Sequence, residues 1–335
     1  MFAESGLTQR TLARIAAAAL ALVSHTSAAA SAHTIQSLTL ARPEGARQYL
    51  LVQPAGTHAG RRPLVILLHG HTGTAAQLLG QAQGAAPLSI WLGIADREGL
   101  LLAVPDGAKG SDGQRGWNDC RSDATSNPRN DDVGLITAII DQAITQHQAD
   151  PMRVYVMGMS NGGMMTFRLA TELGQKLAAV AAVSSSMAAK SQCAAPKIPL
   201  SLLMISGDAD PLVPYQGGEV RFYSQKTRGT VSGIEDAAAF YRKLDGLPGK
   251  ATSSGTLPHR DANDKTRALR TVWGADPTRF QVELVRIHGG GHVEPSITQR
   301  IGILYRTVVG PQNGDFEAAE EAWAFFKDKS NVRKL

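Results

Sequence analysis

Hydrophobic and polar positions follow two alternating spacings along most of the chain. Short, nearly continuous apolar runs are typical of strands buried on both faces, and they occur at residues 63–68, 100–104, 154–157, 178–183 and 200–205. Residues 281–287 are expected to form a last strand. Apolar residues at helical spacing, together with capping signals, predict helices over residues 88–98, 131–147, 161–173, 233–244 and 316–327. This alternation predicts an α/β fold with a mainly parallel sheet and helices on both faces.

Three other segments complete this pattern. Residues 34–40 and 48–52 are expected to form a hairpin around Pro43-Glu44-Gly45. Residues 108–130 are rich in Gly, Asn and Asp and predict a long loop, which in a compact domain is usually functional. Residues 248–265 are polar and show little pattern. Because the sequence has no internal repeat and no linker that would divide it, we expect a single α/β domain over residues 33–335.

The first 32 residues have the pattern of a secretory signal peptide. Arg10 and Arg14 precede an apolar run at residues 15–23, and a small-residue stretch then places Ala30 and Ala32 at a cleavage site. The run is too short to span a bilayer, which needs about 20 residues. The alternative is an amphipathic first helix of the mature fold, but the run has no polar face. We therefore expect a secreted or periplasmic protein without stable membrane association.

Charge and cysteine content refine this expectation. Removal of residues 1–32 lowers the net charge from +5 to +4, and the chain has no run of five basic residues, which argues against a nucleic-acid partner. Cys120 and Cys193 both lie in predicted loops at the same end of the sheet. In an oxidising compartment this pair is expected to form a disulfide, and the alternative is two buried thiols.

Ser160 stands in the sequence Gly158-Met159-Ser160-Asn161-Gly162, directly after a predicted strand and at the start of a helix. This G-x-S-x-G pattern in that setting is typical of a nucleophile turn, in which glycines allow close backbone packing around an exposed serine. The alternative is a Ser/Asn helix cap with glycines for packing. The setting favours a nucleophilic serine.

The two partners of such a serine follow in the required order, acid and then histidine. Asp210 follows the predicted strand at 200–205, and we prefer it to Asp208, which is expected to bond loop amides. His292 follows three glycines after the last predicted strand and is preferred as the base to His288, which stands before them. Ser160, Asp210 and His292 are therefore the expected catalytic triad.

An oxyanion hole is expected from two backbone amides. One belongs to Asn161, the residue after the nucleophile, and the other to His71 in the turn His69-Gly70-His71-Thr72, with Thr72 as the alternative. His69 itself is expected to anchor that turn.

These residues resemble a known family. The motifs that carry the resemblance are Leu68-His69-Gly70, Gly116-Trp117-Asn118, Asp131-Asp132-Val133, Asp150-Pro151, the turn around Ser160, the segment from Gly207 to Pro214 and Gly289-Gly290-Gly291-His292. In this order they are similar to the secreted esterases of the polyhydroxybutyrate depolymerase and feruloyl esterase type (the LpqC-like group), over residues 60–330 or so.

The resemblance implies an α/β-hydrolase fold with an eight-stranded sheet, no cofactor and no metal. It implies ester substrates such as hydroxyalkanoate oligomers, hydroxycinnamoyl-sugar esters and acetylated polysaccharides. It also implies that Trp117 lines the acyl pocket, although a tryptophan in a long loop could instead be a surface plug. The chain departs from the family pattern at His71, where many members have cysteine, and after His292, where Val293-Glu294-Pro295-Ser296 replaces a Trp-Pro-Gly segment and Tyr305 follows in a longer stretch.

Three other functions compete with ester hydrolysis. Peptide or lactone hydrolysis would use the same fold and triad. A metallohydrolase would use the histidines His69, His71, His288 and His292, but no H-E-x-x-H spacing accompanies them. A non-catalytic binding protein on a hydrolase scaffold would have a broken triad, whereas all three members are present here.

Overall fold

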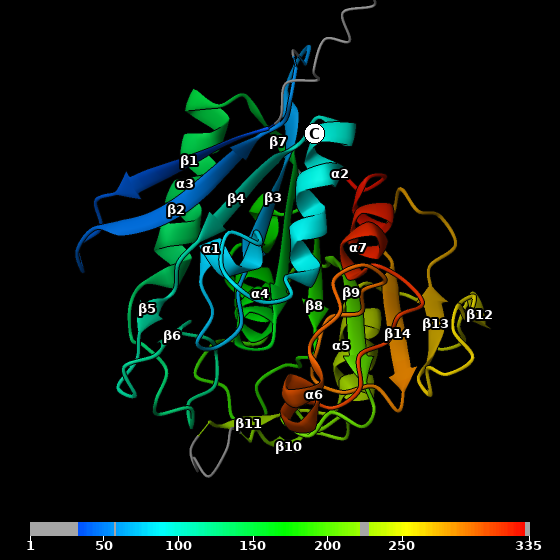
Figure 1. Ribbon diagram of the computed structural model, residues 1–335. Coiled ribbons are helices and arrows are strands. Elements are labelled where there is room, and N and C mark those ends of the chain that lie inside the picture. The colour runs from blue at the N-terminus through cyan, green and yellow to red at the C-terminus, as the bar shows by residue number, and fades with distance from the viewer. Residues whose placement is uncertain (1–32, 57, 222–227, 332–335) are drawn as a thin grey trace, which may run out of the picture. The chain divides into compact units, whose positions relative to one another are not determined.

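One ten-stranded sheet runs through the molecule (Figure 1). The computed structural model describes residues 33–56, 58–221 and 228–331, so the predicted signal peptide lies outside the described residues. The strands follow one another across the sheet in the order β1 (Thr34–Leu40), β2 (Arg47–Gln53), β4 (Leu101–Pro105), β3 (Arg62–Leu68), β7 (Ala149–Met159), β8 (Ala179–Val183), β9 (Ser201–Gly207), β14 (Val282–His288), β13 (Arg267–Trp273) and β12 (Ser253–Thr256).

The six central strands, from β4 to β14, are all parallel. They correspond to six strands predicted from the sequence, and in β3, β4, β8 and β9 almost every residue is buried because helices cover both faces. Two antiparallel strands extend the sheet at each edge. The predicted α/β-hydrolase fold is confirmed, with a sheet of ten strands in place of eight.

Alternate residues of each central strand point to two separate cores. In β3, Leu64, Ile66 and Leu68 pack on one side with helices α3 (Asp132–Gln146), α4 (Asn161–Glu172) and α5 (Ile234–Leu244). Val65 and Leu67 pack on the other side with α1 (Ala75–Leu78), α2 (Ile90–Glu98) and α7 (Ala318–Phe326). Figure 1 shows α2 and α7 in front of the sheet and α3 behind it.

The ends of two helices follow from the sequence. Asp131 caps α3 because its side chain accepts a hydrogen bond from the amide of Gly134 at 2.8 Å. Gly99 ends α2 in the left-handed conformation, with φ of 67°, which glycine adopts without strain. A 3₁₀ helix, Pro87–Ser89, precedes α2, and another, Gly174–Lys176, follows α4.

Three parts of the structure differ from the sequence expectation. The polar segment 248–265 contains strand β12, whose four residues are all exposed and so give no hydrophobic signal. Strand β13 was not expected either, because only Ala268 among its residues is buried. Helix α6 (Ile303–Val309) was not predicted from the sequence either. The remaining short strands are β5 (Ala108–Lys109), β6 (Arg115–Gly116), β10 (Gly218–Glu219) and β11 (Thr230–Val231).

The carboxyl ends of the parallel strands meet at one edge of the sheet, where sites in such folds lie. The turn at His69 follows β3, Ser160 follows β7, Asp210 follows β9, and His292 follows β14. The predicted disulfide between Cys120 and Cys193 joins the long loop after β6 to the loop after β8, with Cα atoms 5.3 Å apart. Within the described part of the chain, no helix is long and apolar enough to cross a membrane.

Candidate active site

The backbone at Ser160 has a conformation that a serine rarely adopts. Its φ is 54° and its ψ is −121°, at the junction between β7 and α4. A non-glycine residue held there costs about 1–3 kcal/mol, and such strain concentrates at functional sites. A side chain at Gly158 would collide with the backbone of Gly162, and one at Gly162 would collide with the carbonyl oxygen of Leu68. The two glycines therefore allow the tight turn that exposes the serine hydroxyl.

Ser160, His292 and Asp210 form a continuous chain of hydrogen-bonding contacts. The Nε2 atom of His292 lies 2.9 Å from the Oγ of Ser160, and its Nδ1 lies 2.7 Å from the Oδ2 of Asp210. The other oxygen of Asp210 accepts hydrogen bonds from the amides of Leu212 and Val213 at 2.7 and 2.8 Å. The three residues predicted as a triad are thus brought together from three separate loops.

The electrostatic environment of His292 suits a general base. Burial disfavours the charged imidazole, but the charge of Asp210, its hydrogen bond and the charge of Glu294 together outweigh burial and raise the pKa of His292 above its ordinary value. The backbone amide of His292 donates to the carbonyl oxygen of Val309 at 2.6 Å, which fixes the ring beside Ser160.

Asp208 and His288, the two alternatives, lie elsewhere. Asp208 accepts from the Gly289 amide at 2.7 Å and from Arg286 at 2.9 Å, so it holds the loop that leads to His292. His288 contacts Asp208 at 3.1 Å, and its side chain is 78% exposed. Neither residue contacts Ser160 in the described structure.

The turn after β3 forms the opposite wall of the site. His69 is buried, its Nδ1 lies 2.7 Å from the carbonyl oxygen of Gly70, and its Nε2 accepts from the amide of Gly107 at 2.9 Å. Burial lowers the pKa of His69 to about 4, so the ring is neutral and anchors the turn, as the sequence indicates. Thr72 was the alternative to His71 as an oxyanion donor. Its amide already donates to the carbonyl oxygen of Arg115 at 2.8 Å, so it is engaged within the protein.

The surroundings of the His71 side chain do not suit a general base. It lies 3.1 Å from Asp112, and burial together with nearby Arg228 lowers the pKa of His71 to about 4. Both ring nitrogens of His69 and of His292 have hydrogen-bonding contacts, and among the described residues no three of the four histidines lie close enough together to hold a metal ion. The four histidines therefore do not converge on a shared metal position.

Trp117 does not line the acyl pocket, contrary to the expectation from the family resemblance. It is 0% exposed, and its indole N–H donates to the carbonyl oxygen of His69 at 2.8 Å. Its amide donates to the Oδ1 of Asn161 at 2.7 Å. A buried indole N–H needs an acceptor, and Trp117 finds one in the turn that it supports. Trp117 therefore connects the His69 turn with Asn161 below the wall of the cavity.

Asp119 is a residue that sequence reasoning did not single out. Its buried carboxylate accepts from Asn161 Nδ2 at 2.7 Å, from Arg121 Nη2 at 2.7 Å and from Asn127 at 3.1 Å. The only signal in the sequence is its place between Trp117 and Cys120 in the long loop. Asp119 therefore fixes the side chain of the residue that follows Ser160.

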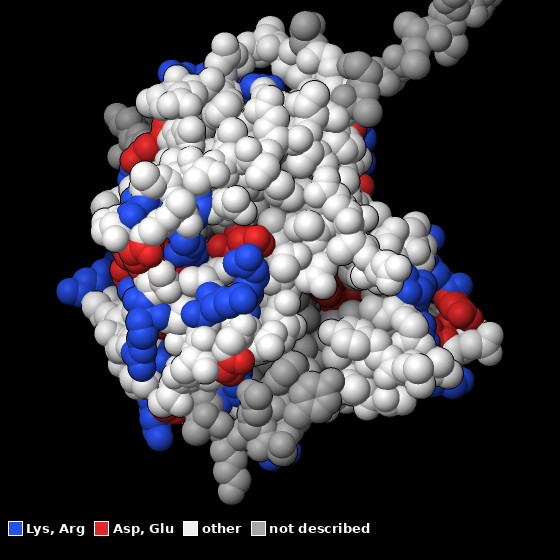
Figure 2. Space-filling view, turned by 60° about the vertical axis from the view of Figure 1, so that its left-hand side comes forward, with Lys and Arg blue, Asp and Glu red and all other residues white. Residues whose placement is uncertain are grey.

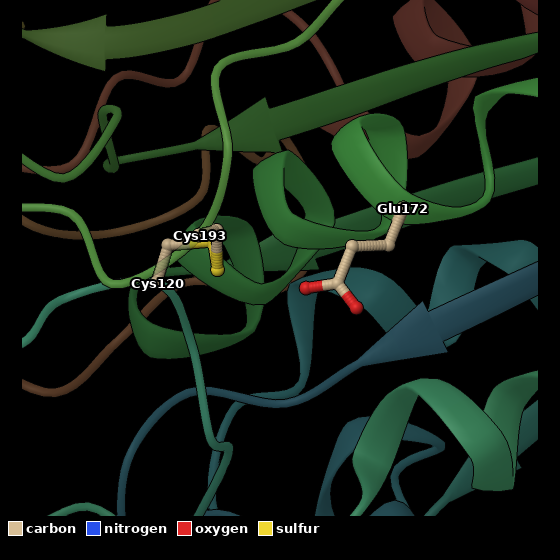
Figure 3. Close-up of side chains that lie close together, drawn as sticks. All are labelled: Cys120, Glu172 and Cys193. Carbon is tan, nitrogen blue, oxygen red and sulfur yellow. A yellow bond between two sulfur atoms is a disulfide. The ribbon is translucent and has the colours of Figure 1, made fainter.

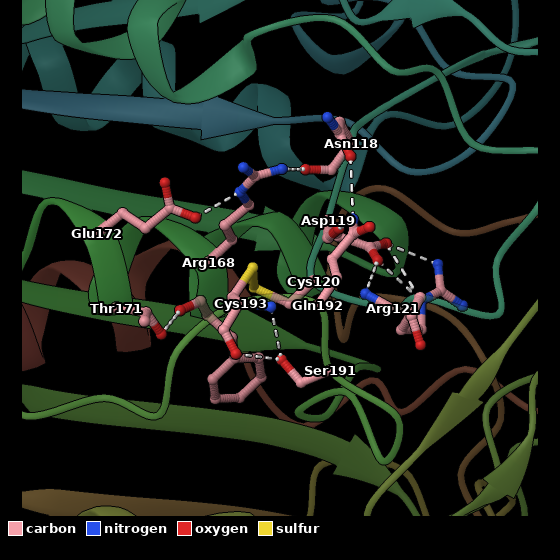
Figure 4. Close-up of a disulfide and its surroundings, with 12 residues drawn as sticks. Asn118, Asp119, Cys120, Arg121, Arg168, Thr171, Glu172, Ser191, Gln192 and Cys193 are labelled. Carbon is pink, nitrogen blue, oxygen red and sulfur yellow. Dashed lines mark hydrogen bonds and ion pairs between the residues drawn. A yellow bond between two sulfur atoms is a disulfide. The ribbon is translucent and has the colours of Figure 1, made fainter.

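The disulfide lies next to this carboxylate. Asp119 and Arg121 are the sequence neighbours of Cys120, and Figure 4 shows them joined by dashed lines beside the disulfide. Gln192 donates to the carbonyl oxygen of Asp119 at 2.9 Å. Glu172 also lies near the two sulfurs, as Figure 3 shows, and these are the only three potential metal ligands that cluster within the described residues. Both sulfurs are joined to one another, so they offer no thiolate to a metal.

A cavity of about 560 Å³ opens between the two walls. Ser160 and His292 line it together with the His69–Thr72 turn. Its apolar wall contains Leu78, Leu88, Met159, Leu212, Val213, Ile301, Tyr305 and Val308, and its charged lining residues are Arg221, Arg228 and Glu294. A cavity of this size and character suits a small, largely apolar organic ligand.

Comparisons with known proteins identify a family for this chain. The family model of the esterase PHB depolymerases matches residues 47–237, which is more than half of the chain. The protein NocK of Nocardia uniformis subsp. tsuyamanensis, which bears the name of an esterase, is 29% identical over 272 residues, covering 79% of this chain and 74% of its own. Feruloyl esterase B of Piromyces equi is 29% identical over 258 residues, covering 74% of this chain. The chain spans only 43% of the length of that second relative.

A solved structure with the same fold is the acetyl xylan esterase from Aspergillus awamori. Its TM-score is 0.55 at 14% identity, and the match covers 88% of this chain and 99% of that one. The fold and the family match define a carboxylic ester hydrolase of the α/β-hydrolase class. The chain belongs to the esterase PHB depolymerase family.

Proposed function

We propose that this protein is an exported serine esterase in which Ser160 is the nucleophile and His292 is the general base. Asp210 orients the imidazole of His292 and stabilises its protonated form. The observation that carries the proposal is the Asp210–His292–Ser160 chain of contacts, at 2.7 and 2.9 Å, in the wall of the cavity. A serine beside an oriented imidazole is the arrangement that activates a hydroxyl for acyl transfer.

The proposed reaction has two halves. His292 takes the hydroxyl proton while Ser160 Oγ attacks the ester carbonyl, and the amides of His71 and Asn161 hold the resulting oxyanion. The carbonyl re-forms as the bond to the alcohol breaks, and His292 gives the proton to the leaving alcohol. Water then attacks the acyl-enzyme and loses a proton to His292. The bond to Ser160 Oγ breaks, His292 returns that proton to Oγ, and the carboxylic acid is released.

The substrates proposed are esters of hydroxyalkanoate oligomers or hydroxycinnamoyl and acetyl esters of sugars. Family membership and the mixed apolar and polar lining of the cavity support this choice. Figure 2 shows Lys and Arg interspersed with Asp and Glu beside a wide uncharged area, a surface more suited to neutral esters than to a polyanion.

We also propose export, with cleavage after Ala32. The basic and apolar pattern of residues 1–32 supports it, and so does the disulfide, since such bonds persist in oxidising compartments. N-terminal sequencing of the protein recovered outside the cytoplasm should begin at His33. A mature protein that retains residues 1–32 would contradict the proposal.

The test of the activity compares p-nitrophenyl esters, peptide anilides and lactones on the purified enzyme and on Ser160→Ala. Ester turnover should dominate, fall by about 10³-fold or more in the variant, and persist after chelation. Preferred cleavage of anilides or lactones would favour the alternative on the same triad. Unchanged ester turnover in Ser160→Ala would contradict the role of Ser160.

A further inference from the structure

The turn that carries His71 lies directly against the nucleophile. A Cβ atom added to Gly70 would lie 3.4 Å from the Cβ of Ser160, and both residues line the catalytic cavity together with His71. Thr72, the next residue, has a φ of 69°, a left-handed conformation that a β-branched residue rarely adopts. A residue keeps such a conformation only where the surrounding structure holds it there. We therefore looked for the contacts that hold this turn beside Ser160.

The hairpin of strands β5 and β6 lies beside both residues whose amides are the proposed oxyanion donors. A Cβ atom added to Gly116 in β6 would lie 3.3 Å from the Nδ1 of His71 and 2.9 Å from the Oδ1 of Asn161. The carbonyl oxygen of Arg115, the residue before Gly116, accepts a hydrogen bond of 2.8 Å from the amide of Thr72. The hairpin therefore supports the turn immediately after His71.

Asp112, between the two strands of this hairpin, makes a second contact with the turn. Its Oδ2 lies 3.1 Å from the Nε2 of His71 and accepts from the Nη1 of Arg228 at 3.2 Å. Its Oδ1 accepts from the amide of Gln114 at 3.0 Å, and Arg228 also donates to Ser126 at 2.8 Å. The side chains of His71, Asp112 and Arg228 are only 8, 12 and 3% exposed, so water competes little with these contacts. Three partners thus fix the carboxylate of Asp112.

The His71 ring is uncharged at neutral pH, because burial and the charge of Arg228 lower the pKa of His71 to about 4. A neutral imidazole donates from one nitrogen only, and the carboxylate of Asp112 beside Nε2 selects that nitrogen as the donor. A hydrogen bond to a charged acceptor is roughly twice as strong as one between neutral groups. The contact therefore restrains the His71 side chain, and the backbone of His71 with it.

We propose that Asp112 is a positioning residue for ester hydrolysis: by holding the His71 side chain, it fixes the backbone amide of His71 where the oxyanion forms. The proposal rests on the proposed reaction at Ser160 and adds to it the residue that orients one of the two oxyanion donors. A donor is effective only at about 2.7–3.1 Å from the oxyanion. A small displacement of the turn therefore weakens stabilisation of the transition state and leaves binding of the substrate nearly unchanged.

Steady-state kinetics of Asp112→Ala and His71→Ala on a p-nitrophenyl ester test the proposal. Loss of an oxyanion donor costs about 10²–10³-fold in kcat, so a displaced donor should cost about 10–100-fold, with KM within about threefold of the wild type. The double variant should lose no more than the worse single variant, because both substitutions remove the same contact. His71→Gln, whose side-chain amide can still donate to Asp112, should recover most of the lost kcat. His71→Ala leaves the pair of Asp112 and Arg228 intact, so it tests the contact even if Asp112→Ala does not fold.

Asp123→Ala is the matched control. Asp123 joins the same long loop to the segment that carries Arg228, because it accepts from the amide of Thr230 at 3.1 Å and from the Thr230 hydroxyl at 2.8 Å. Its contacts are with Thr230 and Lys190 and not with the turn at His71. Its kcat should stay within about threefold of the wild type. Equal losses of kcat in Asp112→Ala and Asp123→Ala would overturn the proposal, because Asp112 would then only hold the loop to that segment.

Inhibition by butylboronic acid gives a second readout that does not depend on turnover. Its boron accepts the oxygen of a nucleophilic serine, whose proton passes to the base, and the tetrahedral adduct places a negatively charged group in the oxyanion hole. The inhibition constant should rise in Asp112→Ala by about the factor by which kcat falls, about 10–100-fold. An unchanged inhibition constant, or full kcat in Asp112→Ala and His71→Ala while Ser160→Ala is inactive, would overturn the role of Asp112 alone. Turnover that survives Ser160→Ala would count against the proposed reaction itself.

Discussion

The carboxylate of Asp119 accepts a hydrogen bond of 2.7 Å from the side-chain amide of Asn161, the residue directly after Ser160. The same Asn161 side chain accepts from the amide of Trp117 at 2.7 Å. Two residues of the long loop thus fix the start of helix α4. Because the proposed oxyanion donor is the backbone amide of Asn161, the loop sets the position of that donor.

Substitution of Asp119 should therefore reduce turnover more than binding. Asp119→Asn keeps the size of the side chain but removes the negative charge to which both Asn161 and Arg121 donate hydrogen bonds. Loss of an oxyanion donor costs about 10²–10³-fold in kcat, so a displaced donor should cost about 10–100-fold, with KM nearly unchanged. Steady-state kinetics on a p-nitrophenyl ester measure both values.

Asn127→Ala is the matched control for Asp119→Asn, because Asn127 donates to the same carboxylate but does not contact Ser160 or Asn161. Its kcat should stay within about threefold of the wild type, as expected for a substitution outside the reacting groups. Equal losses of kcat in both variants would show that Asp119 only stabilises the loop.

Removal of the disulfide should lower stability. The bond between Cys120 and Cys193 spans a sequence separation of 73 residues, and closing a loop of that length stabilises a fold by about 4 kcal/mol in the chain-entropy model. Urea unfolding of the Cys120→Ser, Cys193→Ser double variant should show a loss of this order, and the wild type in reductant should match it. Equal unfolding midpoints with and without reductant would contradict a bridged pair.

The pH profile should report the pair formed by Asp210 and His292. Asp210 raises the pKa of His292, and protonated imidazole cannot accept the Ser160 proton, so kcat/KM falls as the pH drops through this raised pKa. Asp210→Asn removes the causes that raise the pKa of His292 most and leaves burial, which lowers it. The acidic limb should move to lower pH while kcat falls by about 10³–10⁴-fold.

Asp208→Asn is the control for this pH experiment, since Asp208 binds Arg286 and Gly289 and not His292. Its acidic limb should stay where the wild type has it. If the acidic limb moved in Asp208→Asn and stayed in Asp210→Asn, Asp208 and not Asp210 would be the carboxylate that raises the pKa of His292.

Trp117→Phe should affect stability and leave acyl preference alone. The variant removes the indole N–H that donates to His69 and leaves a buried carbonyl oxygen without that partner, at a cost of about 1–3 kcal/mol. The relative rates on acetyl, butyryl and hexanoyl esters should not change, because Trp117 lies beneath the cavity wall. A changed preference for acyl chain length would show that Trp117 does line the acyl pocket.

Much of the fold could be predicted because its central strands are buried on both faces. Residues 63–68 are apolar throughout and lie in β3, as predicted. All four residues of β12 are exposed, so its sequence has no hydrophobic pattern that would predict a strand. The triad could be predicted because each member has a local signal: glycines around Ser160, glycines before His292, and an acid in the right order. Asp119 has no such signal, since its role depends on a contact with Asn161, 42 positions away in the sequence.

The same reasoning explains the misplacement of Trp117. An aromatic residue in a polar loop suggests a ligand-binding surface, and nothing local reveals that its indole meets the carbonyl oxygen of His69, 48 positions away. The contact depends on how β3 and the long loop come together, which only the assembled sheet defines.

Covalent labelling of Ser160 tests the central claim most directly. The purified enzyme is treated with a serine-directed fluorophosphonate, and its mass, the labelled peptide and the residual ester turnover are measured together. The account predicts one adduct per chain, located on Ser160, with turnover lost in proportion to labelling and no adduct in Ser160→Ala. An adduct on another residue, or full turnover by a chain completely labelled at Ser160, would contradict it.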